Sequence, residues 1–209
     1  MIVQCVRVLV LCWIGMSGLY GCSSILKGEG SPATRYYLLS SMNKGAAGDT
    51  AFHREIRLAM EPVELPDYLS RLQIVHRLGD HRLAFGETDL WGEDLDSGLT
   101  RVMVENFSRL MNSNNVWRLP MKNPVQPDFR LRVQFIRFEV DSDGRALLSA
   151  RWTLQGQGAY KDQTFGTISE IHGGPVGTQN TDAQVAALSA VLETFCREIA
   201  ANIPNQGRS

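Results

Sequence analysis

Residues 129–155 read FRLRVQFIRFEVDSDGRALLSARWTLQ, and this stretch decides the fold class. From Phe129 to Phe135 apolar and polar residues alternate, which is the period of a strand with one buried face. The apolar residues then continue at Ile136 and Phe138, on the other parity. A β-bulge near residues 135–136 accounts for this change of phase.

The second half of the stretch predicts a partner strand. Residues 141–144 read DSDG, which is typical of a turn, and apolar residues alternate again from Ala146 to Leu154. We therefore expect the two halves to pair as a long antiparallel hairpin.

Shorter segments predict the rest of the fold. Further strands are expected at residues 35–39, at 56–60, in a hairpin of 71–78 with 83–85, and at 164–172. Apolar residues recur at helical spacing in two segments, one from Leu99 to Leu110 and one from Val185 to Ile199. Side-chain oxygens that suit a helix N-terminus precede both helices, at Asp94, Asp96 and Ser97 and at Thr181 or Asp182. The pattern predicts a single-domain α+β fold, an antiparallel β-sheet with two long helices packed on one face.

The first 21 residues have the composition of a signal peptide. One cation, Arg7, precedes an uncharged apolar run from Val8 to Leu19, which is shorter than a spanning helix requires. Residues 19–22, LYGC, resemble the bacterial lipobox, in which the cysteine is acylated before cleavage. We expect a lipoprotein signal peptide at residues 1–21 and lipid attachment at Cys22.

The remaining cysteines agree with a lipid anchor. Cys5 and Cys12 would leave with the signal peptide, so that only Cys196 stays free. Without the lipobox, four cysteines in a secreted chain would instead indicate disulfides. Cys196 lies beside the apolar stripe of the last helix, and we expect it to be a small buried hydrophobe. Two or three acyl chains hold a protein stably at a membrane, where one does not.

Ser23 and the segment around it predict the membrane destination of the protein and the start of its folded domain. Ser23 stands where an aspartate favours inner-membrane retention in Gram-negative sorting, which indicates an outer-membrane destination facing the periplasm. Residues 22–34 are rich in glycine and serine and predict a flexible tether. The folded domain is expected at residues 35–204.

Composition and spacing exclude several functions. A net charge of −1 provides no field that would attract nucleic acid, and Arg130, Arg132 and Arg137 fit the solvent face of a strand. The four histidines do not have zinc spacing, and the sequence has no GxSxG motif. We therefore expect no catalytic residue, no metal, no cofactor and no nucleic-acid partner, and we do not expect an enzyme.

Residues 63–75, VELPDYLSRLQIV, are the most distinctive motif. Together with the lipobox, Tyr36 to Leu38 and Trp91, they resemble the ABC-type transport auxiliary lipoprotein family. The resemblance implies an outer-membrane lipoprotein that docks an MCE-domain protein of an envelope-spanning system for moving lipids between membranes. It also implies membrane attachment through the anchor and possible homo-oligomerisation. The candidate partner-contact or motif residues are Leu65, Pro66, Tyr68, Leu69, Gln73 and Trp91.

The motif itself leaves two structural readings open. Pro66 has a fixed φ and biases Leu65 toward an extended conformation, which predicts a rigid corner. This corner either presents Tyr68 and Leu69 to a partner or folds them into the core at the end of an edge strand. Two other functions also stay open, an envelope lipoprotein with an assembly or structural role and a lipid-anchored hydrolase.

Overall fold

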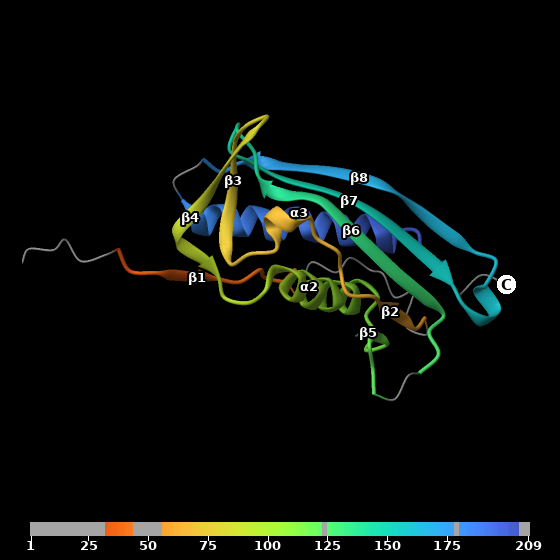
Figure 1. Cartoon of the computed structure of the whole chain (residues 1–209). Coiled ribbons are helices and arrows are strands. Elements are labelled where there is room, and N and C mark those ends of the chain that lie inside the picture. The colour runs from red at the N-terminus through yellow and green to blue at the C-terminus, as the bar shows by residue number, and fades with distance from the viewer. Residues whose placement is uncertain (1–31, 44–55, 123–124, 178–179, 205–209) are drawn as a thin grey trace, which may run out of the picture. The chain divides into compact units, whose positions relative to one another are not determined.

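The hairpin expected within residues 129–155 is the longest pairing in the computed structural model (Figure 1). β6 (Phe129–Val140) runs antiparallel to β7 (Arg145–Gly156), and the register shifts between Phe135 and Arg137. The predicted bulge is therefore confirmed. The structure describes residues 32–43, 56–122, 125–177 and 180–204.

Six further strands, two long helices and two short 3-10 turns complete the described part of the chain. In chain order these elements are β1 (Arg35–Tyr37), β2 (Leu58–Met60), η1 (Asp67–Leu69), β3 (Gln73–Gly79), β4 (Arg82–Trp91), α2 (Leu95–Leu110), β5 (Val116–Arg118), η2 (Gly158–Tyr160), β8 (Thr164–Pro175) and α3 (Thr181–Ala200).

The fold class is confirmed as a single α+β domain, and the sheet is mixed rather than purely antiparallel. β7 and β8 pair antiparallel, as do β3 and β4. Four pairings are parallel, namely β1 with β4, β2 with β5, β2 with β6 and β3 with β6. Parallel pairing needs a crossover connection, and strands of three residues contain no alternation that would reveal their partner. β5 was not expected from the sequence for the same reason.

One edge of β6 is shared by several short segments. β2 pairs with its start through residues Leu58 to Met60, and β3 reaches its end through His76 and Val140. Between them, Glu64 bridges to Gln134. The motif at residues 63–75 therefore runs beside the central hairpin.

The two helices cover one face of the long strands (Figure 1). In β6 the residues at alternate positions from Phe129 to Phe135 are buried, whereas Arg130, Arg132 and Gln134 are exposed. The apolar stripe of α3 is buried as predicted, and so is Cys196. The domain core lies between this sheet face and the helix pair.

The helix starts follow the sequence, but the side-chain caps expected at both helices do not: Asp94 makes no capping hydrogen bond at α2, and Asp96 and Ser97 lie within that helix. α2 begins after Asp94 and is followed by Asn112, whose φ of 46° lies in the left-handed region that asparagine tolerates. α3 is capped by Asn180, whose side chain accepts a hydrogen bond from the Ala183 amide, and not by Thr181 or Asp182. Thr181 instead donates to Asp89 Oδ2 at 2.8 Å.

Candidate functional site

The motif forms a corner that leads into β3. Pro66 is extended, with φ −66° and ψ 150°, and the single turn η1 follows it directly. The Leu69 amide donates to the Pro66 carbonyl at 2.9 Å, and the Ser70 amide donates to the Asp67 carbonyl at 3.1 Å. The rigid corner expected from the proline is therefore present.

The main chain ahead of the corner is fixed to β6. The Glu64 amide donates to the Val133 carbonyl at 3.0 Å, and the Phe135 amide donates to the Glu64 carbonyl at 2.9 Å. Two backbone hydrogen bonds to a central strand leave this residue little freedom. The corner is thus held at a constant place relative to the sheet.

Tyr68 and Leu69 fold inward. Leu69 is in the hydrophobic core, and Tyr68 is half-buried and packs against that core. The Tyr68 hydroxyl donates to Glu139 Oε2 at 2.7 Å. Of the two interpretations left open by the sequence, the structure agrees with the one in which Tyr68 and Leu69 fold toward the core.

Glu139 on β6 is the residue on which the motif converges. Its side chain is completely buried, and its Oε1 accepts from Arg77 Nε at 2.6 Å and from Arg137 Nε at 3.0 Å. A buried carboxylate is tolerated only when it is paired and hydrogen-bonded, and Glu139 meets both conditions with three donors. Burial, reinforced by the Glu139 hydrogen bond, raises the pKa of Tyr68 above its ordinary value. We call Tyr68, Arg77, Arg137 and Glu139 the Glu139 cluster.

Sequence reasoning missed Glu139 because nothing local marks it. It lies far from the motif in sequence, on a strand where a glutamate ordinarily faces water. The only signal is its position just after the bulge, where the faces of β6 exchange. That signal becomes meaningful only when the partner residues on β3 are known.

Beside the corner lies a hollow of about 340 Å³, formed by the motif and the start of α2. Leu65 and Arg71 line it from the motif, and Asp94 and Asp96 line it from the helix end. Two exposed apolar residues neighbour the lining residue Arg71: its guanidinium lies 4.3 Å from the ring centre of Phe85, which is 39% exposed, and Leu72, which follows it in the sequence, is 45% exposed. We call Leu65, Arg71, Leu72, Phe85 and Asp94 the docking surface.

Two other motif residues lie where β3 and β4 pair. Trp91 is buried at the end of β4, and its amide donates to the Leu72 carbonyl at 2.6 Å. Gln73 is exposed and pairs in register with Leu90. Of the motif residues Leu65, Pro66, Gln73 and Trp91, only Leu65 lines the hollow, and Pro66 follows it in the corner.

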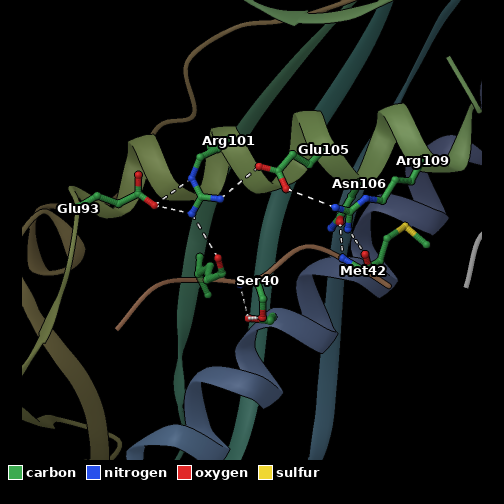
Figure 2. A network of polar contacts seen from close by, with 9 residues as sticks. Ser40, Met42, Glu93, Arg101, Glu105, Asn106 and Arg109 are labelled. Atoms are coloured by element: carbon green, nitrogen blue, oxygen red, sulfur yellow. Dashed lines mark hydrogen bonds and ion pairs between the residues drawn. The ribbon is translucent and has the colours of Figure 1, made fainter. Parts of the chain in front are cut away.

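A second element with many polar contacts lies where the chain enters the domain, after β1. We call residues 38–43 the strap, and Figure 2 shows the polar contacts that join it to α2 and α3. Asn106 accepts from the Met42 amide at 2.8 Å, Arg101 donates to the Leu39 carbonyl at 3.3 Å, and Arg109 donates to the Met42 carbonyl. The Ser40 amide donates to Ser189 Oγ on α3 at 3.2 Å. The strap therefore bridges the two helices.

Two observations concern metal binding and thiol chemistry in the described residues. They contain no group of three or more His, Cys, Asp or Glu side chains arranged to hold a metal ion. Burial raises the pKa of the Cys196 thiol to about 12, and its Sγ lies 3.8 Å from the Asn106 amide nitrogen. Cys196 is thus an inert core residue. Cys22 lies outside the described residues, and none of the helices within them has the length and hydropathy of a membrane span.

Comparison with known proteins identifies relatives of the whole domain. A family model described as the ABC-type transport auxiliary lipoprotein component matches residues 37–200. No curated protein matches the chain.

Solved structures confirm that this fold recurs. The crystal structure of an uncharacterised protein is similar at a TM-score of 0.65 and 24% identity, over 82% of this chain and 99% of that one. A protein from Xanthomonas campestris, from a family of unknown function, is similar at a TM-score of 0.61 and 15% identity, over 80% and 93%. A chain of the PelC dodecamer from Paraburkholderia phytofirmans is more distant, at a TM-score of 0.41 and 9% identity, over 83% and 95%.

Proposed function

The chain belongs to the ABC-type transport auxiliary lipoprotein component family, and from this premise we propose that it docks an MCE-domain protein at the outer membrane. In this role it is a non-catalytic component of an ABC-linked system that moves lipids between membranes. The lipid on Cys22 anchors it, residues 22–34 tether it, and the domain faces the periplasm.

The observation that carries the docking role is the construction of the docking surface. A corner held by backbone hydrogen bonds to β6 and by the buried Glu139 cluster forms one side of a hollow, and the exposed apolar side chains of Leu72 and Phe85 neighbour its lining residue Arg71. Side chains that are already fixed lose little conformational entropy on binding, which favours tight association. Exposed apolar residues next to a hollow with charged residues at its border are typical of protein-binding surfaces.

The strap supports the anchoring part of the proposal. It is the first described segment after β1, and its main chain is bonded to side chains of both helices. A pull on the N-terminal tether would therefore be resisted by β1 and the helix layer before it reaches the corner. The docking surface can thus keep its shape while the protein is attached to a membrane.

Recovery of the partner with the full-length lipidated protein from envelope membranes tests this function. We expect acylated Cys22 by mass spectrometry and co-purification of an MCE-domain protein. Leu72→Asp places a charge in the docking surface and should reduce that recovery by about tenfold or more, as at an interface hot spot. Ile168→Asp is the matched control, because Ile168 is a similarly exposed apolar residue, 52%, on β8.

The outcomes separate the alternatives. An acylated protein that never recovers an MCE-domain partner contradicts the transport role and favours an envelope lipoprotein with an assembly or structural function. If Leu72→Asp and Ile168→Asp reduce recovery of the partner equally, the assignment of the docking surface is contradicted. The assembly state of the purified protein, measured by light scattering, tests the accompanying proposal that it forms homo-oligomers.

A further inference from the structure

A second hollow lies on the sheet face that the helices leave open, and its chemistry differs from that of the docking surface. Its volume is about 350 Å³, and its lining includes Arg77, Asp80, Arg137, Asp141, Leu147 and His172. The strand register places Glu139, Leu147 and His172 side by side across β6, β7 and β8. The floor is therefore formed by three neighbouring strands.

Of the two arginines of this hollow, Arg137 has hydrogen-bond donors to spare. Arg137 uses its Nε for Glu139, and within the described residues its two terminal nitrogens have no protein acceptor. Arg77 uses Nε for Glu139 and Nη1 for the Asp80 carbonyl at 3.2 Å, and its guanidinium also hydrogen-bonds the Tyr68 side chain. Because Glu139 is completely buried and fixes both guanidinium groups, the free N–H groups of Arg137 are already oriented for an anion, and Arg77 adds positive charge beside them.

Two carboxylates line the same hollow. Asp141 Oδ1 accepts the amides of Asp143 and Arg145, at 2.9 and 2.8 Å, and no donor in the described residues reaches its Oδ2. The Asp80 side chain is exposed and has no hydrogen bond or ion pair there. These carboxylates would repel a ligand with negative charge alone and attract one that also contains a cation.

We propose that this hollow binds a phosphoethanolamine group, the headgroup of a zwitterionic phospholipid. The phosphate would accept from the free N–H groups of Arg137 beside the positive charge of Arg77, and the ammonium would donate to Asp80 and Asp141. A choline headgroup has no N–H to donate, and a glycerol headgroup has no cation, so both fit less well. The site rests on the proposed lipid transport for the source of its ligand, and it shares no residue with the docking surface.

Calorimetric titration of the full-length protein in a non-ionic detergent tests the site with soluble headgroups. We expect glycerophosphoethanolamine to bind with a dissociation constant on the order of 1 mM, and glycerophosphocholine and glycerol 3-phosphate to bind several times more weakly. Arg137→Gln should weaken binding by about tenfold, while Tyr68 and Arg77 still pair with Glu139. Arg130→Gln, an exposed arginine on the same strand, is the matched control.

Asp80→Asn tests the ammonium contact separately from the phosphate contact. This variant should bind glycerophosphoethanolamine more weakly, and its affinity for glycerol 3-phosphate should be unchanged or slightly higher. Absence of saturable binding up to about 20 mM, at least tenfold above the expected constant, overturns the site. Equal affinity for all three headgroups, or equal loss in Arg137→Gln and Arg130→Gln, also overturns it.

Labelling of arginine with phenylglyoxal, read by mass spectrometry, distinguishes the source of the headgroup. Protection of Arg137 when the full chain is reconstituted in vesicles of phosphatidylethanolamine and phosphatidylcholine, relative to phosphatidylcholine alone, assigns a membrane lipid. Protection by soluble glycerophosphoethanolamine alone assigns a lipid that is delivered to the domain. Protection in neither case contradicts the proposal, and because recovery of the MCE-domain partner is measured independently, either hypothesis can fail without the other.

Discussion

Two networks in this domain each pair arginine with glutamate, and they differ in how far these side chains are exposed to water. In the Glu139 cluster the carboxylate is completely buried and its two arginines are 19% and 33% exposed. In the network on α2, Arg101 and Glu105 are both 40% exposed, although the Arg101–Glu93 distance of 2.6 Å is as short as the Arg77–Glu139 distance (Figure 2). Distances alone would rank the networks as equal, whereas burial predicts a large difference.

Burial changes how much an ion pair contributes to the free energy of unfolding. An exposed ion pair replaces water that solvates each charge well, and it is screened by salt, so it contributes little. A buried carboxylate has lost its water, and removing either side of its pairing leaves a charge or a donor without compensation. The Glu139 cluster should therefore control the stability of the motif, whereas the α2 network adjusts the attachment of the strap.

The largest expected effect comes from Glu139→Ala. It leaves Arg77, Arg137 and the Tyr68 hydroxyl without their shared acceptor, and we expect the free energy of unfolding to fall by about 3 kcal/mol. Glu61→Ala is the matched control, because Glu61 pairs with Arg132 at the surface at 2.8 Å, between the two Glu139 distances of 2.6 and 3.0 Å, and it should cost less than about 1 kcal/mol. Urea unfolding followed by circular dichroism measures both.

If Glu139→Ala does not fold, Glu139→Gln keeps the shape and removes the charge. It should still destabilise the domain more than Glu61→Ala does. Equal losses in the buried and exposed variants would show that burial is not what separates the two networks.

This comparison also explains what the sequence could predict. The bulged hairpin at residues 129–155 and the stripes of both helices were evident, because alternation over many residues is a strong signal. The parallel partners of β1, β2 and β5 were not, since three-residue strands contain almost no information on register. The motif was found by its pattern, but its inward-facing role depends on Glu139 and Arg137, which long-range pairing brings to Tyr68.

Asp89 provides an intermediate case, because its side chain is 14% exposed. Arg35 donates to it at 2.6 and 2.9 Å, and Thr181 donates at 2.8 Å, so this carboxylate joins β1, β4 and α3. The hydrogen bond from Arg35 is the main reason that the pKa of Asp89 lies below its ordinary value of 3.8. Asp89→Asn should lower the free energy of unfolding at pH 7 by about 1–2 kcal/mol.

The pH dependence of that loss follows from the sign of the shift. A carboxyl whose pKa is lowered by folding contributes stability that is complete above 3.8 and is lost as the pH falls through its folded value. The difference between the native protein and Asp89→Asn should therefore shrink as the pH falls below 3.8. Urea unfolding at several pH values measures it, with Asp162→Asn, at an exposed position, as control. A difference that stays constant on acidification would contradict the assignment.

The smallest expected effect is that of Arg101→Gln. Glutamine keeps the helix propensity of the site and removes the pairs with Glu93 and Glu105, and we expect a loss of about 0.5 kcal/mol. Because exposed pairs are screened, the loss should be smaller in 1 M salt than in 0.05 M salt, a range over which the Debye length shortens from above 10 Å to about 3 Å. A loss above about 2 kcal/mol that salt does not reduce would show that the bond from Arg101 to the strap carbonyl of Leu39, and not the ion pairs, dominates this network.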